Sequence, residues 1–300
     1  MELSKGHMYF TLSVILASFR PIFYKQFKEY FFMTIFLSLL SMYTGGLGFM
    51  YYNLKKGESF KEKFLETLSS KNLLISLLSE IRFILKQFAV ISLPLTVSIP
   101  MNNLWMVSST YFGRVINNEI PTIKQLVSIG VLIIGAIILN LNKLLEASKG
   151  KKSKVNKNYY RGIISLLVST IIGGYVYSMF KKISTETKDS GFTMAVESGG
   201  ALIVAAFILM YDVLFCKKIN IPSMKNIVLM FLALTFLFNI DILIRFEGLS
   251  RIKQLDTIFL SQIGTIIPVM IGFLYYGEKL DMYKIAGLLT IIGGVLYGSL

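Results

Sequence analysis

The sequence predicts an all-α integral membrane protein whose ten transmembrane helices form two inverted five-helix repeats around a central cavity. Hydrophobic residues make up 54% of the 300 residues and charged residues only 16%, well below the roughly 25% charged residues of a soluble domain. Apolar segments long enough to cross a bilayer recur along the whole chain. Lys86 and Arg245 lie inside two of them, at matching places. A charge in hydrocarbon costs about 2.5 to 3.5 kcal/mol, so its duplication indicates a cavity.

The composition also excludes several classes of protein. The formal net charge is +14, but most basic residues lie in short connections between apolar segments, as in bilayer proteins generally, so no nucleic-acid partner is expected. The chain has one cysteine, Cys216, and one histidine, His7. These cannot build a disulfide framework, a Cys/His metal site or a catalytic triad. We therefore expect no metal, no cofactor and no catalytic residue.

The ten predicted spans follow from the length of about 20 apolar residues that a helix needs to cross the hydrocarbon. The third and fourth run almost continuously, with Pro94 and Pro100 near the break, so eight or nine spans stay open as an alternative. In order, the spans are 8–25, 30–52, 72–91, 93–113, 123–142, 159–180, 192–215, 225–246, 254–275 and 283–300.

Two connections are long enough to hold structure of their own. In residues 53–71, Phe60, Phe64 and Leu68 recur every four residues among lysines and glutamates, which suits an interfacial helix. A solvated linker fits that segment equally well. The second connection contains the basic run KGKKSKVNK and predicts a flexible hydrophilic linker at the centre of the chain.

The central linker divides the chain into two copies of one unit. A shift of 159 residues places Glu119 on Glu278, Gly135 on Gly294 and Lys86 on Arg245. The predicted domains are a first repeat over 1–145, the linker over 146–158 and a second repeat over 159–300. Because each repeat holds five spans, an odd number, the two repeats must cross the membrane in opposite orientations.

The second copy carries its motif most clearly from Phe246 to Gly298. There it resembles the C-terminal half of an EamA-type repeat of the drug/metabolite transporter superfamily, in which a Gly-Glu turn precedes a glycine-rich last helix. The first copy repeats the order more faintly, in Ala89-Val90, Asn118-Glu119 and Gly130 to Gly135. The residues that carry the resemblance are Phe246-Glu247-Gly248-Leu249-Ser250, Leu274 to Leu280 with Gly277-Glu278, Ala286-Gly287 and Gly293-Gly294-Val295.

This resemblance implies a cavity lined mainly by helices 1, 3, 4, 6, 8 and 9, alternating access, and both termini in the cytosol. Lysines and arginines divide almost equally between the two sides, so the charge bias favours neither orientation. A nucleotide-sugar or sugar-phosphate antiporter is an alternative within the superfamily. That branch usually carries lysines at positions that fall here on Trp105 and near Thr257, and neither residue is basic.

Ionisable residues inside the spans are the candidate site. Arg82 and Lys86 are four residues apart on one helix face, and Asp241 and Arg245 occupy the equivalent positions in the second repeat. They could grip an anionic group, form a salt-bridge network, or snorkel to a helix end. The network would pair Asp241 with Arg245 or Arg82, and Glu80 with a cation.

The balance of charges argues against a purely anionic ligand. Arg82, Lys86 and Arg245 are offset by Glu80, Asp241 and Glu247, so a zwitterion or polar metabolite fits as well as a phosphate ester. Burial could also make a carboxylate carry a coupling proton, and the candidates are Glu80, Asp241 and Glu197. The expected substrate-binding residues are Arg20, Arg82, Lys86, Gln87, Asn102, Asn103, Asp241, Arg245 and Gln262.

The first functional hypothesis is a secondary-active transporter or exchanger of a small polar or anionic metabolite, with no ATPase because no Walker lysine loop is present. We expect no enzymatic activity. Its partners would be a small-molecule substrate and the bilayer of a multi-pass membrane protein. An intramembrane enzyme and a non-transporting membrane scaffold are the rivals. Gly294 and Gly298 form a GxxxG pattern, which serves either a homodimer or packing within one chain.

Overall fold

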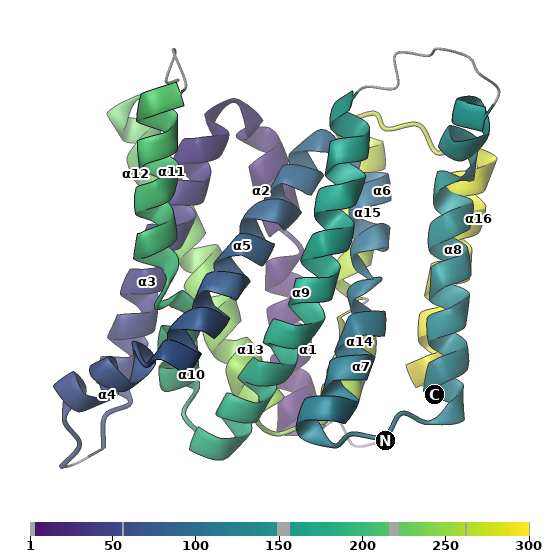
Figure 1. Cartoon of the computed structure of the whole chain (residues 1–300). Coiled ribbons are helices and arrows are strands. Elements are labelled where there is room, and N and C mark those ends of the chain that lie inside the picture. Colours follow the sequence, from purple (N-terminus) through teal and green to yellow (C-terminus); the bar gives the residue numbers. More distant parts are fainter. Residues whose placement is uncertain (1–3, 56, 149–156, 216–221, 262, 300) are drawn as a thin grey trace. The chain divides into compact units, whose positions relative to one another are not determined.

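All regular structure is helical. The computed structural model describes residues 4–55, 57–148, 157–215, 222–261 and 263–299, and it has no strand within these ranges (Figure 1). The all-α class is therefore confirmed. In the same ranges four helical segments are long and apolar enough to cross a membrane, which agrees with an integral membrane protein; they are Lys28–Tyr52, Asn158–Thr187, Ser190–Ile208 and Met224–Leu249.

Each of the ten predicted spans coincides with one helix or with consecutive helices. The helices are α1 (Lys5–Ala17), α2 (Arg20–Gln26), η1 (Lys28–Tyr30), α3 (Phe31–Tyr52), α4 (Phe60–Thr67), α5 (Ser70–Ser92), α6 (Leu95–Asn102), α7 (Trp105–Asn117), α8 (Ile123–Ser148), α9 (Lys157–Thr187), α10 (Ser190–Ser198), α11 (Ala201–Phe215), α12 (Met224–Thr235), η2 (Phe236–Ile240), α13 (Asp241–Leu249), α14 (Gln254–Leu260), α15 (Ile263–Leu274) and α16 (Met282–Ser299).

Several predicted spans are broken helices, and the breaks have local causes. Pro21 lies in the first turn of α2. Its missing N–H costs α2 no hydrogen bond there. The same residue could not continue α1, because proline cannot donate the backbone hydrogen bond of a helix interior. Gly199 and Gly200 separate α10 from α11, since glycine weakens a helix interior. The eighth span is interrupted by the π-helix η2, whose wider turn is often found at functional sites.

The two long connections have different outcomes. α4 occupies Phe60–Thr67, and the rings of Phe60 and Phe64 stack with centroids 6.2 Å apart. A helix is therefore present within residues 53–71, and its interfacial position stays a prediction. The predicted central linker falls mostly on residues 149–156, which lie outside the described residues. α8 extends through Ser148, beyond its predicted end at residue 142.

The chain forms two compact units, and each takes helices from both halves of the sequence. Unit 1 comprises Met1–Ile84 and Met179–Ile252, and unit 2 comprises Leu85–Ser178 and Lys253–Leu300. The division into 1–145, 146–158 and 159–300 describes sequence repeats rather than compact units, and it stays a prediction.

In unit 1, α3 packs against α10, α11 and α12, and α1 packs against α13. The α1–α13 contact is close because glycines face it from both sides. A Cβ on Gly248 would lie 2.8 Å from the backbone nitrogen of Phe10, and one on Gly6 would lie 2.8 Å from the Cβ of Arg251. Small residues of this kind are what allow membrane helices to approach each other closely.

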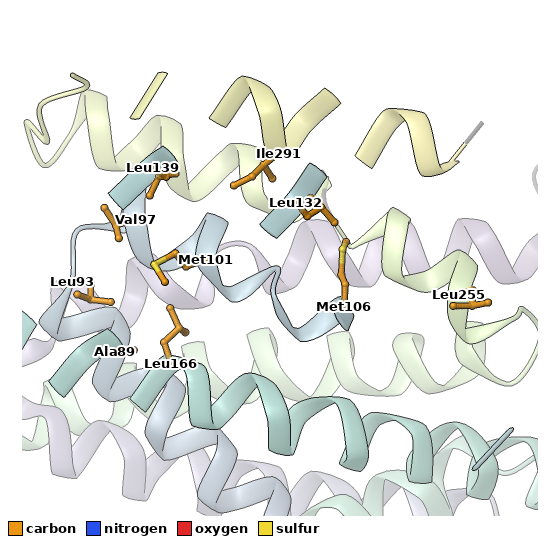
Figure 2. Packing of buried hydrophobic residues seen from close by; sticks show 10 residues of the cluster. All are labelled: Ala89, Leu93, Val97, Met101, Met106, Leu132, Leu139, Leu166, Leu255 and Ile291. Carbon is orange, nitrogen blue, oxygen red and sulfur yellow. The ribbon is translucent and has the colours of Figure 1, made fainter. Parts of the chain in front are cut away.

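In unit 2, α8 and α16 lie side by side (Figure 1). Gly135, Gly287 and Gly294 lie in their contact, and the hydroxyl of Ser128 donates to the carbonyl of Gly294 at 2.5 Å. One glycine of the predicted GxxxG pattern therefore packs within the chain, and the homodimer stays a prediction. The buried core of this unit is drawn in Figure 2 and comprises Ala89, Leu93, Val97, Met101, Met106, Leu132, Leu139, Leu166, Leu255 and Ile291.

An ion pair outside the membrane segments fixes the start of α10. Asp189 is the N-cap of that helix and accepts from the backbone N–H of Phe192 at 3.0 Å. The Lys63 ammonium donates to it at 3.0 Å and the Asn53 amide at 3.2 Å. Burial alone would raise the pKa of Asp189, but these hydrogen bonds outweigh burial and lower it. Burial alone would lower the pKa of Lys63, but its ion pairs with Glu58 and Asp189 outweigh burial and raise it.

We expect Asp189→Ala to lower the free energy of unfolding by about 1 kcal/mol, the usual effect of losing an N-cap. Because its pKa is lowered in the folded state, Asp189 stabilises the fold above its unfolded pKa of about 3.9, and this is lost as pH falls through the folded pKa. The thermal midpoints of the purified protein and the variant should therefore converge only below about pH 4. Glu186→Ala, at an exposed neighbouring position, is the control; a similar loss there would contradict the capping role.

Candidate functional site

Six charged side chains form a cluster in unit 1, which we call the charged cluster. Three are cations and three are carboxylates, and each interacts electrostatically with at least one other member. They come from four helices, so residues far apart in the sequence meet. The members are Arg20 on α2, Glu80 and Arg82 on α5, Glu197 on α10, and Asp241 and Arg245 on α13.

Asp241 is completely buried, with 0% of its surface exposed, and both of its oxygens are used. The hydroxyl of Ser13 donates to Oδ1 at 2.5 Å, and Arg20 forms an ion pair with Oδ2. A buried carboxylate is stable when it is paired and hydrogen-bonded in this way. The close packing of α1 on α13 brings Ser13 within reach.

Arg20 also binds the π-helix η2. Its guanidinium donates to the carbonyl of Leu237 at 3.2 and 3.3 Å and to that of Phe238 at 3.4 Å. Its Cζ lies 3.9 Å from the centroid of the Phe238 ring, a favourable cation–π distance. Because a π-helix departs from the regular i to i−4 pattern, it presents carbonyl groups to an outside donor. No sequence pattern predicted η2.

Arg245, four residues after Asp241 on α13, pairs with Glu197 on α10. One guanidinium nitrogen lies 3.1 and 3.3 Å from the two carboxylate oxygens, and Glu197 is only 3% exposed. The break between α10 and α11 is held by Ser76, which donates to the carbonyl of Glu197 at 2.8 Å and accepts from the N–H of Gly200 at 2.6 Å. The pair is thus fixed at a helix end.

Glu80 is the exception in the charged cluster. It is 0% exposed, yet neither carboxylate oxygen has a hydrogen-bond partner among the described residues. Its electrostatic neighbours are Glu197, a like charge, and Arg82 on its own helix. Because an uncompensated buried carboxylate is costly, Glu80 is charged only at the expense of stability.

These pairs differ from those that the sequence suggested. Asp241 pairs with Arg20 rather than with Arg245 or Arg82, and Glu80 has no direct cationic partner in the described part of the chain. The reason is that α13 packs against both α1 and α10. Asp241 binds Ser13 on α1 and Arg20 on α2. Arg245 binds Glu197 on α10, although only four residues separate it from Asp241.

The other predicted site residues belong to unit 2. The amide of Asn103 donates to the hydroxyl of Thr265 at 3.3 Å, and both residues are buried, as the interhelical alternative expected. Gln87 is 4% exposed, and its side-chain oxygen has no hydrogen-bond partner among the described residues. Lys86 and Asn102 are partly buried. Gln262 lies outside the described residues.

A polar network that sequence reasoning missed surrounds Gln254, the first residue of α14. Its amide nitrogen donates to the hydroxyls of Ser109 and Ser178, both at 2.7 Å, and its oxygen accepts from Asn117 at 2.8 Å. Gln254 is 0% exposed. The only signal was a lone glutamine at the start of the ninth span. Because the network is saturated, its role is structural.

The chain is similar to curated bacterial proteins named "Probable glucose uptake protein GlcU". The relative from Bacillus anthracis is 25% identical over 201 residues, covering 65% of this chain and 66% of the relative. Relatives from two Bacillus cereus strains are 23% and 24% identical over the same length. The chain therefore matches about two thirds of the length of these relatives. No protein-family model matches it.

A solved structure, named only "Crystal structure of protein", shares the fold. Its TM-score is 0.66 at 13% sequence identity, and the match covers 100% of this chain and 99% of the other. The relatives are named for uptake, which agrees with a membrane transporter that is not an enzyme. Membership of the drug/metabolite transporter superfamily stays a prediction.

Proposed function

We propose that the chain is a secondary-active transporter of a small polar metabolite, that it works by alternating access, and that the charged cluster is the centre of its site. The observation that carries this proposal is Glu80, a fully buried carboxylate that has no hydrogen-bond partner within the described ranges and lies beside balanced ion pairs. Ionisable groups within membrane segments are expensive and are usually functional. The ten spans and inverted repeats belong to the same proposal, supported by the agreement between predicted spans and observed helices.

A neutral sugar is the substrate class that we propose to test first. The charged cluster holds three cations and three carboxylates, and protonating Glu80 would leave an excess of only one positive charge, less than the charge of about −1.5 to −2 on a phosphate ester. Charged side chains in pairs can still donate to and accept from hydroxyl groups. The similarity to proteins named for glucose uptake supports the same class. A small anionic metabolite, a nucleotide sugar and a sugar phosphate become secondary alternatives.

Among the three coupling-proton candidates, Glu80 has the strongest case. Asp241 is held by Ser13 and Arg20, and Glu197 by Arg245, so protonating either would break an existing pair. Protonating Glu80 breaks none and removes a buried charge. We propose that Glu80 takes up a proton in the loaded state and releases it when the opposite side opens to water.

The test is proteoliposome transport of labelled glucose. With an imposed proton gradient, the wild type should accumulate glucose, whereas Glu80→Gln should retain counterflow exchange but lose gradient-driven accumulation by about tenfold or more. Glutamine mimics the protonated side chain and keeps its size. Glu62→Gln, at an exposed position, is the matched control. Absence of saturable glucose transport would reject the substrate class, and normal accumulation by Glu80→Gln would reject its role.

The scaffold hypothesis is favoured by one observation, the ion pair between Arg245 and Glu197. A sealed structural core predicts that every buried charge is paired, and Glu80 does not fit that expectation. Glucose counterflow separates the two, because a scaffold gives none.

A further inference from the structure

Two glutamates of unit 2 cap helices that belong to the opposite half of the sequence. Glu278, in the connection between α15 and α16, accepts from the backbone N–H groups of Leu95 and Thr96, both at 2.8 Å. Glu119, in the connection between α7 and α8, accepts from those of Gln254 and Leu255, at 2.9 and 3.1 Å. In each case the two carboxylate oxygens take one N–H each, at the first two residues of a helix.

The two contacts occupy equivalent positions in the sequence. The shift of 159 residues that relates Glu119 to Glu278 also relates Leu95 to Gln254, the first residues of α6 and α14. The contact of Glu278 with the start of α6 therefore recurs as the contact of Glu119 with the start of α14, with the two sequence halves exchanged. Such reciprocity is what a pseudo-two-fold arrangement of the two halves produces.

The local backbone around each glutamate recurs as well. The preceding residue has a left-handed conformation in both, with φ of 55° at Asn118 and 62° at Gly277. The N–H of Glu119 donates to the carbonyl of Gly113 at 3.2 Å, and the corresponding bond from Glu278 to Gly272 is 3.1 Å long. The two turns thus aim their carboxylates in the same way.

The chemistry of these contacts favours a charged side chain. The first N–H groups of a helix have no partner within the helix and lie at the positive end of its dipole. A carboxylate that accepts two of them makes charge-assisted hydrogen bonds, which are shorter and stronger than neutral ones. The start of α6 also needs an outside acceptor, because its N-cap residue is Pro94, which has no side-chain acceptor.

We infer that Glu119 and Glu278 are paired positioning residues, two reciprocal latches that each hold the first turn of the opposite half's short helix. This inference rests on the proposed function for its consequence in transport. The latches lie at opposite ends of unit 2. Glu278 holds the start of α6, and Glu119 follows the end of α7, so the α6–α7 segment separates them. Figure 1 shows the α7–α8 and α15–α16 connections at opposite ends of these helices.

Opposite positions give opposite expected effects. Alternating access requires the two ends of the central site to open in turn. Weakening a latch lowers the cost of parting the helices at its own end, so the equilibrium moves toward the state that is open there. Glu119→Gln and Glu278→Gln should therefore shift the transporter in opposite directions.

The first experiment measures amide hydrogen exchange on the full-length protein. Glu278→Gln should speed exchange at the start of α6 by about fivefold or more and leave the start of α14 unchanged, and Glu119→Gln should do the reverse. Glutamine keeps the shape but loses the charge and one acceptor oxygen. Glu119→Asp and Glu278→Asp, which keep the charge, should give smaller effects in the same places. The inference would be overturned if exchange stayed unchanged in both glutamine variants, or if the faster exchange did not follow this reciprocal pattern.

The second experiment measures sidedness, using glucose transport in right-side-out and inside-out vesicles. The ratio of the half-saturating concentrations on the two sides should move in opposite directions for the two glutamine variants, by about threefold or more, and stay constant in Glu62→Gln. A purely structural role would reduce the folded fraction without moving this ratio, and a shift in the same direction for both would overturn the inference. If the wild type does not transport glucose, the proposed substrate fails, and hydrogen exchange still decides the latches.

Discussion

Replacing Asp241 by alanine is expected to destabilise the protein more than any other single change in the charged cluster. The substitution leaves the Arg20 guanidinium, whose side chain is only 14% exposed, without its carboxylate. Removing one partner of a buried ion pair typically costs about 3 to 5 kcal/mol. For a chain of this size this corresponds to a fall in the thermal midpoint of about 10 °C. The measurement is the thermal midpoint in detergent solution.

A double-mutant cycle separates loss of the pair from loss of packing. Arg20→Gln with Asp241→Asn removes both charges and keeps the side-chain volumes close to the originals. We expect the double variant to be more stable than the sum of the two single effects predicts, by about 1 to 3 kcal/mol. Glu186→Ala, with an exposed side chain, is the control for removing a carboxylate as such. Simple additivity would show that Arg20 and Asp241 do not act as a pair.

The arrangement of helices along the chain could be predicted from the sequence because hydropathy depends only on local composition. The segment 30–52 became α3 at Phe31–Tyr52, and 283–300 became α16 at Met282–Ser299. Breaks at Pro21 and at Gly199-Gly200 have visible causes, since these residues weaken or end helices. The π-helix η2 has no such cause in the segment FLFNI, and its carbonyls are explained only by the approach of Arg20.

The identity of the charged residues could be predicted, but their pairing could not. Arg20, Glu80 and Asp241 were conspicuous because a charge within an apolar segment is costly wherever it points. Pairing depends on which helices pack beside α13, and helical spacing within one element does not contain that information. For this reason the expected bond between Asp241 and Arg245 was replaced by two bonds to other helices.

The roles of the two latch residues, Glu119 and Glu278, could not be predicted from the sequence either. Glu119 and Glu278 stood out in the sequence as a repeated position, and the repeat explained their recurrence without giving them a role. A carboxylate that accepts hydrogen bonds from backbone N–H groups does not require any particular side chain at those positions. Leu95 and Gln254, the two equivalent helix starts, share no chemistry. The connection between each glutamate and its helix is visible only in the folded structure.

A pair of glycines on α16 provides the second large expected effect. A Cβ on Gly287 would lie 2.7 Å from the backbone nitrogen of Leu139 and 2.8 Å from the carbonyl oxygen of Gly135. Backbone atoms of α8 cannot move aside as a flexible side chain can, so Gly287→Ala must push the two helices apart. Overpacking of this kind costs about 1 to 3 kcal/mol. We expect a cost near the upper end of this range, because the contact is with backbone atoms. We expect a fall of several degrees in the thermal midpoint.

Gly293→Ala is the matched control, because it makes the same chemical change in the same helix. No described heavy atom outside the local helix lies within 4 Å of a Cβ at that position. Alanine favours a helix over glycine by about 0.8 to 1 kcal/mol, so Gly293→Ala should raise the thermal midpoint slightly or leave it unchanged. A loss at Gly293 as large as that at Gly287 would mean that the surface of α16 is buried against another molecule, as the predicted homodimer would require. Opposite signs at the two positions would instead assign the glycine-rich last helix to packing on α8 within one chain.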